Sequence, residues 1–168
     1  FPPRAIEAVS DAAERLADRM GPDDVVNTLW AWETLIKGTA LTKAHKVSPS
    51  ALGAVAHAAR RVAPLKQKDA RNPTVMLNGM VSLMETGLTV DPRVFQVLNK
   101  ALSKISPDLK GNEVADAMLV WWRVMVLGGT VEAKVFRRVS IQAGNQAKSM
   151  TGRDVANVLV VWAKVFRR

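Results

Sequence analysis

Side chains that commonly carry catalysis are scarce in this sequence. Cysteine is absent, which excludes thiolate nucleophiles, disulfides and Cys-bearing zinc or iron–sulfur sites. The two histidines, His45 and His57, do not stand at a metal-ligand spacing. Asp23 and Asp24 suit the first turn of a helix, where the helix dipole favours acids, and Gly128-Gly129 indicates a helix end rather than a phosphate-binding loop. The sequence therefore predicts no enzyme, no cofactor and no metal site.

Binding of a polyanion is the chemistry that the charge favours. The 168 residues carry a net charge of +9. Residues 1–46 hold six Lys/Arg and seven Asp/Glu, a sum of −1, whereas residues 47–168 hold eighteen and eight, a sum of +10. Such an excess is typical of proteins that bind nucleic acid. The alternative is a basic protein whose charge only keeps it soluble.

One nine-residue segment occurs twice. Residues 24–32 read DVVNTLWAW and residues 154–162 read DVANVLVVW, with five identical positions. Residues 75–80 and 113–118 follow the same pattern, in which apolar residues stand at i, i+4, i+7 and i+11 and form one stripe of an α-helix. The polar anchors of the four copies are Asn27, Asn78, Asp116 and Asn157.

A helix start precedes each of these copies. The starts cover residues 1–6, 47–52, 90–95 and 131–136 and precede their polar anchors by 26, 31, 26 and 26 residues. Ser48 and Asp91 suit the N-cap, and the prolines that follow them suit the first helical position. Thr151 and Asp154 predict a capping box at the start of one of the second helices.

These patterns predict an all-α fold of about four stacked helix-turn-helix repeats of roughly 38–46 residues, an α-solenoid. The repeats are assigned to residues 1–46, 47–89, 90–130 and 131–168 of a single array, which we expect to be a piece of a longer chain. No apolar run approaches the roughly 20 residues of a membrane span, so no membrane partner is expected.

The second-helix pattern resembles the octotricopeptide repeat family, whose motif is close to D-x-x-N-x-L-W-A. Residues 24–31 match it directly, residues 154–161 keep its Asp, Asn and Leu, and Pro2-Pro3 match the opening of the first helix. The resemblance implies an RNA-binding protein of an organelle, mitochondrial or alternatively chloroplast. Related helical arrays also occur as components of mitochondrial ribosomes, so the resemblance implies rRNA or an organellar transcript and neighbouring ribonucleoprotein subunits as partners.

Basic residues of the predicted first helices are the candidate RNA contacts. A column of Lys and Arg along stacked helices would follow a phosphate backbone, and interspersed amides would bond to bases; the alternative is a solvated helix face. The candidate set is Arg60, Arg61, Arg93, Gln96, Lys100, Lys104, Lys134, Arg137, Arg138 and Gln142.

The tryptophans and the polar anchors have structural interpretations beside the functional one. Trp32, Trp121 and Trp162 lie on the apolar stripe, which predicts core positions rather than base stacking. Trp30 and Trp122 lie off the stripe and are candidates for exposure or for a protein neighbour. The four anchors either read nucleotides or bond to adjacent backbone. The rival to RNA binding is a protein-binding scaffold without direct RNA contact.

Overall fold

The computed structural model describes residues 3–37, 47–64 and 72–165, and within these ranges the chain is helical without strands. Its α-helices are α1 (Pro3–Leu16), α2 (Pro22–Lys37), α3 (Pro49–Val62), α4 (Asn72–Glu85), α5 (Pro92–Ile105), α6 (Gly111–Val126), α7 (Ala133–Gln146) and α8 (Gly152–Val165). Short 3-10 helices follow three of them: η1 (Ala17–Arg19), η2 (Ser106–Asp108) and η3 (Ala147–Ser149). The predicted all-α fold is confirmed. His45 and the residues at both ends of the predicted array, 1–2 and 166–168, lie outside the described residues.

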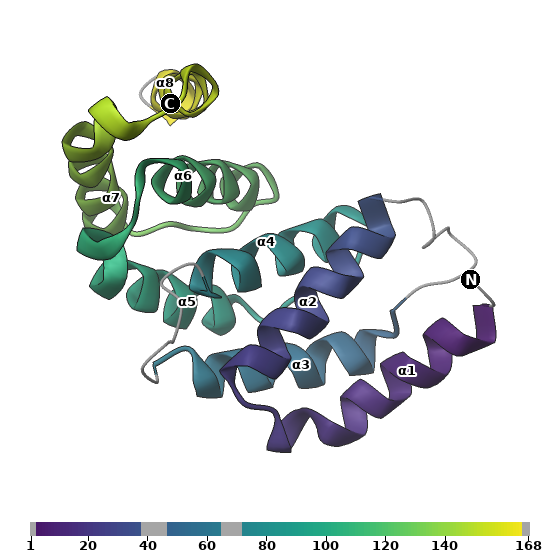
Figure 1. Ribbon diagram of the computed structural model, residues 1–168. Coiled ribbons are helices and arrows are strands. Elements are labelled where there is room, and N and C mark those ends of the chain that lie inside the picture. The colour runs from purple at the N-terminus through teal and green to yellow at the C-terminus, as the bar shows by residue number, and fades with distance from the viewer. Residues whose placement is uncertain (1–2, 38–46, 65–71, 166–168) are drawn as a thin grey trace.

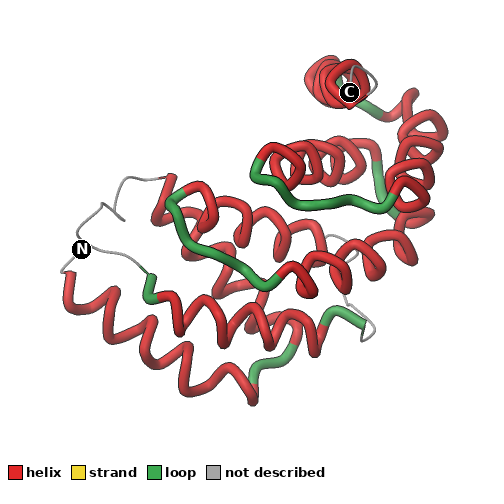
Figure 2. The backbone as a smooth tube through the Cα atoms, turned by 180° about the vertical axis from the view of Figure 1, so that it is seen from behind, coloured by secondary structure: helices red, strands yellow, loops and turns green. Residues whose placement is uncertain are grey.

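The helices form four hairpins that stack in two layers. The first helices α1, α3, α5 and α7 contact one another in chain order, and so do the second helices α2, α4, α6 and α8. The first helices follow the outer side of a curve and the second helices its inner side (Figure 1). Seen from behind, extended loops lead from α4 to α5 and from α6 to α7, returning the chain to the outer layer (Figure 2). This is the predicted solenoid of helical hairpins.

Local hydrogen bonds start the helices where the sequence predicts. The Ser48 hydroxyl accepts from the backbone N–H of Ala51 at 3.1 Å, and the Asp91 carboxylate accepts from that of Arg93 at 2.9 Å. Each N-cap thereby satisfies a backbone donor that the first turn leaves unpaired.

The acid that opens the repeated second-helix segment is also a capping residue. Asp24 accepts from the Gly21 N–H at 2.9 Å, and Asp154 accepts from the Thr151 N–H at 2.9 Å. The Thr151 hydroxyl accepts in return from the Asp154 N–H at 3.3 Å, so the predicted capping box is confirmed. Hydrogen bonds from Thr151 hold the pKa of Asp154 below its ordinary value.

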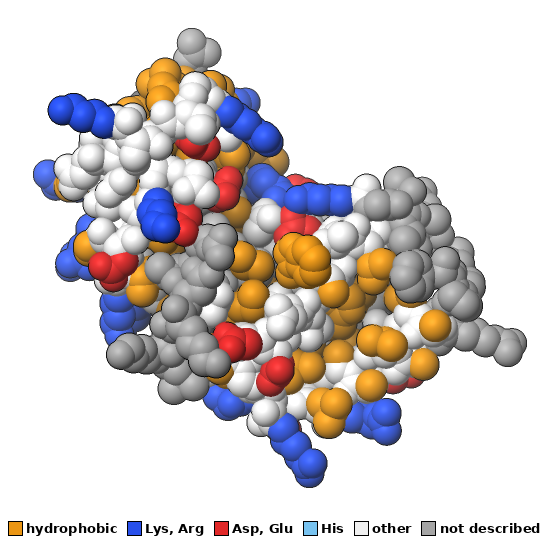
Figure 3. All heavy atoms as spheres, in the orientation of Figure 1, with side chains coloured by type: hydrophobic (Ala, Val, Ile, Leu, Met, Phe, Trp, Pro, Cys, Tyr) orange, Lys and Arg blue, Asp and Glu red, His pale blue; other side chains and the backbone are white. Residues whose placement is uncertain are grey.

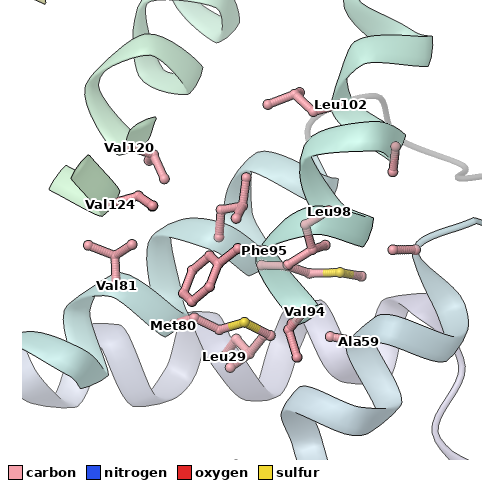
Figure 4. Close-up of a cluster of buried hydrophobic side chains, with 14 of the residues drawn as sticks. Leu29, Ala59, Met80, Val81, Val94, Phe95, Leu98, Leu102, Val120 and Val124 are labelled. Carbon is pink, nitrogen blue, oxygen red and sulfur yellow. The ribbon is translucent and has the colours of Figure 1, made fainter. Parts of the chain in front are cut away.

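The apolar stripes of the first three second helices form the core. Val25, Leu29 and Trp32 are buried, as are their counterparts in α4 and α6. Phe95 and Leu98 of α5 reach into the same core beside residues of α2 and α4 (Figure 4). A single hairpin could not bury these stripes, so stacking supplies the hydrophobic stabilisation of the array.

In the last two hairpins a hydrogen bond joins the stripe tryptophan to the first helix of the same hairpin. Trp121 Nε1 donates to Asn99 Oδ1 at 2.7 Å, and Trp162 Nε1 donates to Ser140 Oγ at 3.1 Å. Both partners stand 22 residues before the tryptophan. Ser10 stands 22 residues before Trp32 and is buried, but its hydroxyl has no hydrogen-bond partner among the described residues, so the first hairpin lacks this bond. The second hairpin has Leu83 in place of the tryptophan. Counted from the start of the repeat, its residue equivalent to Asn99 and Ser140 is Ala56, so the polar residue is absent where the indole donor is absent.

Candidate nucleic-acid interface

Three consecutive first helices carry cations without acids. α3, α5 and α7 together hold eight Lys or Arg and no Asp or Glu, whereas α1 holds three acids and two arginines. These helices form the outer layer on the convex side of the array. Figure 3 shows basic side chains along the edge of the molecule formed by α5 and α7. The eight cations are Arg60, Arg61, Arg93, Lys100, Lys104, Lys134, Arg137 and Arg138.

Five of these eight cations are exposed to solvent. Lys100, Lys104, Lys134 and Arg137 are exposed and have no ion-pair partner among the described residues. The Arg93 side chain is 75 % exposed, and its Nε lies 3.7 Å from an Asp91 carboxylate oxygen, a distance that leaves the guanidinium open on its other edge. We name these five residues the outer cation set.

The repeat register aligns part of the outer cation set. Arg93 and Lys134 follow the first residue of α5 and of α7 and occupy the same position of successive hairpins. Gln96 and Arg137 share another position three residues later, and both are exposed. The alignment places a donor or cation at matching positions of adjacent helices, as a phosphate backbone that crosses them would require.

Two arginines of the predicted set donate hydrogen bonds to the preceding hairpin. Arg61 Nη2 donates to the carbonyl oxygens of Ala17, at 3.2 Å, and Met20, at 2.7 Å. Arg138 Nη1 donates to the carbonyl and hydroxyl oxygens of Ser103 at 3.5 and 3.3 Å. Both side chains remain exposed, but part of their donor capacity serves stacking. Arg60 is half-buried, with Nη2 3.3 Å from Nδ1 of His57.

Gln142 does not belong to the interface. It is 7 % exposed, and its amide donates to the carbonyl oxygens of Pro107 and Leu109 at 3.1 and 3.0 Å. The prediction that this amide bonds to a base is wrong in this arrangement, because it lies inside the joint between the α5–α6 connection and α7. Asn99, interspersed among the same cations, is also buried and accepts the Trp121 bond.

The inner layer contains a second candidate binding feature. A groove of about 460 Å³ lies between α2, α4 and α6 and is lined by Trp30, which is 58 % exposed. Its floor is a network in which Arg123 donates to Glu85 at 2.7 and 2.9 Å and also to Asn78, and Asn78 donates to Glu33. The anchor Asn78 therefore has a structural role.

The other anchors and Trp122 have different environments. Asn27 and Asp116 are exposed, and Asn157 is half-buried. Partial desolvation by neighbouring protein atoms and the nearby carboxylate of Asp154 raise the pKa of Asp116. Trp122 is half-buried, and the Nζ of Lys164 lies 4.8 Å from its ring centroid, so a cation–π contact links α6 to α8.

The described parts of the chain show neither a metal cluster nor a membrane-crossing helix. Within them, no three His, Cys, Asp or Glu side chains gather as metal ligands. Across the same ranges, no helix is both long enough and apolar enough to cross a bilayer. Comparisons with models of known protein families, with curated proteins and with solved structures find no match.

Proposed function

We propose that this chain binds RNA along its outer layer, with the outer cation set of Arg93, Lys100, Lys104, Lys134 and Arg137 contacting the phosphate backbone. The observation that carries the proposal is the run of three successive first helices with eight cations and no acid. A solvated helix face that only confers solubility has no need to exclude acids from three helices in turn. All five residues are exposed, and all but Arg93 have no ion-pair partner among the described residues, so their charge is available to a polyanion.

Electrostatic binding makes a quantitative prediction about salt. Each cation that neutralises a phosphate of single-stranded RNA contributes about −0.7 to the slope of log K against log [salt]. Five contacts give a slope of about −3.5, which corresponds to a loss of roughly a hundredfold in affinity between 50 and 200 mM salt. Fluorescence anisotropy with a labelled single-stranded oligonucleotide measures the slope directly.

A matched pair of double variants separates the outer cations from general charge. The double variant Lys134→Gln with Arg137→Gln removes two members of the outer cation set. Its slope of log K against log [salt] should be less steep by about 1.4. Arg15→Gln with Arg19→Gln removes the same charge from the first hairpin and leaves the slope nearly unchanged. Equal losses in the two double variants, or affinity that does not respond to salt, would refute the proposed surface.

The proposal extends to an organellar ribonucleoprotein, with rRNA or an organellar transcript as the RNA. The resemblance of residues 24–31 to the octotricopeptide motif supports this extension and favours the mitochondrion, with the chloroplast as the alternative. Sedimentation of the native protein with organellar ribosomes tests it. Loss of the protein from the ribosomal fraction after ribonuclease treatment supports attachment through RNA.

A protein-binding scaffold is the second candidate, favoured by the exposed Trp30 beside the groove of the inner layer. Tryptophan is enriched at the centres of protein interfaces. Ribonuclease treatment before a pull-down distinguishes the two functions, because partners of a scaffold remain bound. Trp30→Ala then removes those partners in the scaffold and leaves the salt slope of RNA binding unchanged.

A further inference from the structure

The inner layer has a charge pattern opposite to that of the outer layer. The second helices α2, α4 and α6 together hold six Asp or Glu and two Lys or Arg, whereas α3, α5 and α7 hold eight cations and no acid. The six inner acids are Asp23, Asp24, Glu33, Glu85, Glu113 and Asp116. This face of the array therefore favours a positively charged ligand.

Two adjoining hollows lie on the inner layer and share Trp30 as a wall. One is the groove of about 460 Å³ and the other has a volume of about 330 Å³; both are lined by Trp30, Thr74, Val75 and Asp116. Each combines residues of α2, α4 and α6, which follow one another along the inner side of the curve (Figure 1). Trp30 is 58 % exposed, so much of its indole is open to a ligand.

Asp116 has no neutralising partner at these hollows. It is exposed and makes no hydrogen bond and no ion pair among the described residues. Other charged side chains of the groove are paired within the chain, since Lys37 pairs with Glu33 and Arg123 pairs with Glu85. The carboxylate of Asp116 is thus available to a cation from outside.

This carboxylate is unfavourable for the folded chain alone. Partial desolvation by neighbouring protein atoms and the carboxylates of Asp154 and Glu113 raise the pKa of Asp116. Binding sites commonly keep polar groups in positions that lower stability, because the ligand supplies the missing interaction. A cation beside Asp116 would supply it here.

A buried hydroxyl at the same hollows also lacks a partner. Thr74 is 6 % exposed and lines both of them. Its Oγ1 has no hydrogen-bond partner among the described residues, although buried hydroxyls usually have one. Thr34, which lines the larger groove, instead donates to the carbonyl oxygen of Trp30 at 2.8 Å. The Thr74 hydroxyl is therefore free to accept a hydrogen bond from a ligand.

A guanidinium group matches these features. Its flat face stacks on an indole, and its fork of N–H groups forms charge-assisted bonds with a carboxylate while others donate to a hydroxyl. An ammonium group lacks the flat face and the fork. The chain already contains a cation–π contact on the inner layer, where the Nζ of Lys164 lies 4.8 Å from the ring centroid of Trp122.

We propose that the hollows beside Trp30 bind an arginine side chain of a partner protein, with the guanidinium stacked on Trp30 and bonded to Asp116 and Thr74. Val75 and Leu119 line the larger groove with apolar surface that accepts an apolar neighbour of the arginine, so the occupant is a peptide segment. The inference rests on the scaffold function proposed for this groove and is independent of RNA binding.

Two capped peptides test the proposal on the full chain. Acetyl-Gly-Leu-Arg-Leu-Gly-amide carries the guanidinium, and the same peptide with citrulline keeps the shape without the charge. The indole N–H signal of Trp30 in a ¹H–¹⁵N correlation spectrum, assigned by its absence from Trp30→Ala, reports binding. We expect the arginine peptide to bind about tenfold more tightly than the citrulline peptide. The net charge of +9 disfavours non-specific binding of a cationic peptide elsewhere.

A matched pair of variants separates Asp116 from general charge. Asp116→Asn weakens binding of the arginine peptide about tenfold, to the level of the citrulline peptide. Asp11→Asn removes the same charge from an exposed site on α1 that lines neither hollow, and it leaves the affinity unchanged. Circular dichroism confirms that both variants fold.

Thr74→Val separates a ligand contact from a structural role. The variant keeps the branched shape and removes the unpaired hydroxyl, so it weakens binding of the arginine peptide about threefold. Its midpoint of urea unfolding does not fall, because no hydrogen bond within the chain is lost.

Three results overturn the arginine site: equal affinities of the two peptides, a Trp30 signal that does not move up to about 10 mM arginine peptide, or equal losses in Asp116→Asn and Asp11→Asn. The pull-down with Trp30→Ala decides the scaffold function separately, because partners that depend on Trp30 without an arginine site indicate a scaffold of another specificity. RNA is absent from the assay, and Lys134→Gln with Arg137→Gln leaves the peptide affinity unchanged.

Discussion

The hydrogen bond between Trp121 and Asn99 provides a sensitive test of how the third hairpin is held together. Its donor and acceptor are 2.7 Å apart on side chains that are at most 2 % exposed, so no solvent water replaces a lost partner. Asn99→Ala leaves the indole N–H buried and unpaired. A buried hydrogen-bond donor without an acceptor costs about 1–3 kcal/mol, and we expect a loss of about 2 kcal/mol in the free energy of unfolding.

A double-mutant cycle separates the bond from the loss of packing. Trp121→Phe alone leaves the Asn99 Oδ1 acceptor without the indole donor, whereas the double variant removes both polar partners. The cost of the double variant therefore falls below the sum of the single variants by about 1–2 kcal/mol. Urea unfolding followed by circular dichroism measures all four chains. The matched cycle uses Ser140→Ala and Trp162→Phe, where the half-buried indole can bond to water and the coupling is smaller. A coupling at Asn99 no larger than that at Ser140 would refute the argument.

Three further substitutions test packing and charge. Gly79→Ala forces a methyl group against the Leu29 backbone and costs about 1–3 kcal/mol in urea unfolding, whereas Gly53→Ala, with open space around it, stabilises α3 by about 0.5–1 kcal/mol; the opposite signs are the test. Asp116→Asn raises the melting temperature at pH 7. Partial desolvation and the carboxylate of Asp154 raise the pKa of Asp116 above its ordinary 3.8, so the folded state loses stability as pH rises through the interval between the unfolded-state and folded-state pKa values. The gain should vanish at about pH 3, where both states hold the proton; a gain that persists there would refute an electrostatic cause.

The sequence was sufficient to predict the hairpins because their determinants are local or periodic. Ser48, Asp91 and Thr151 cap helices through bonds within three residues, and the stripe around each anchor repeats the period of an α-helix. The hydrogen bond between Trp121 and Asn99 could also have been found, since the indole and its partner keep the same 22-residue separation in the last hairpin.

The roles of individual polar residues were harder to predict because they depend on how far successive hairpins rotate. Gln142 reaches carbonyls 33 and 35 residues away, and Arg61 reaches carbonyls 41 and 44 residues away. On a helical wheel these residues are polar like their neighbours, and only the packing of one hairpin on the next decides which of them face solvent. The same rotation decides that the second helices form the inner layer, which periodicity within a hairpin does not specify.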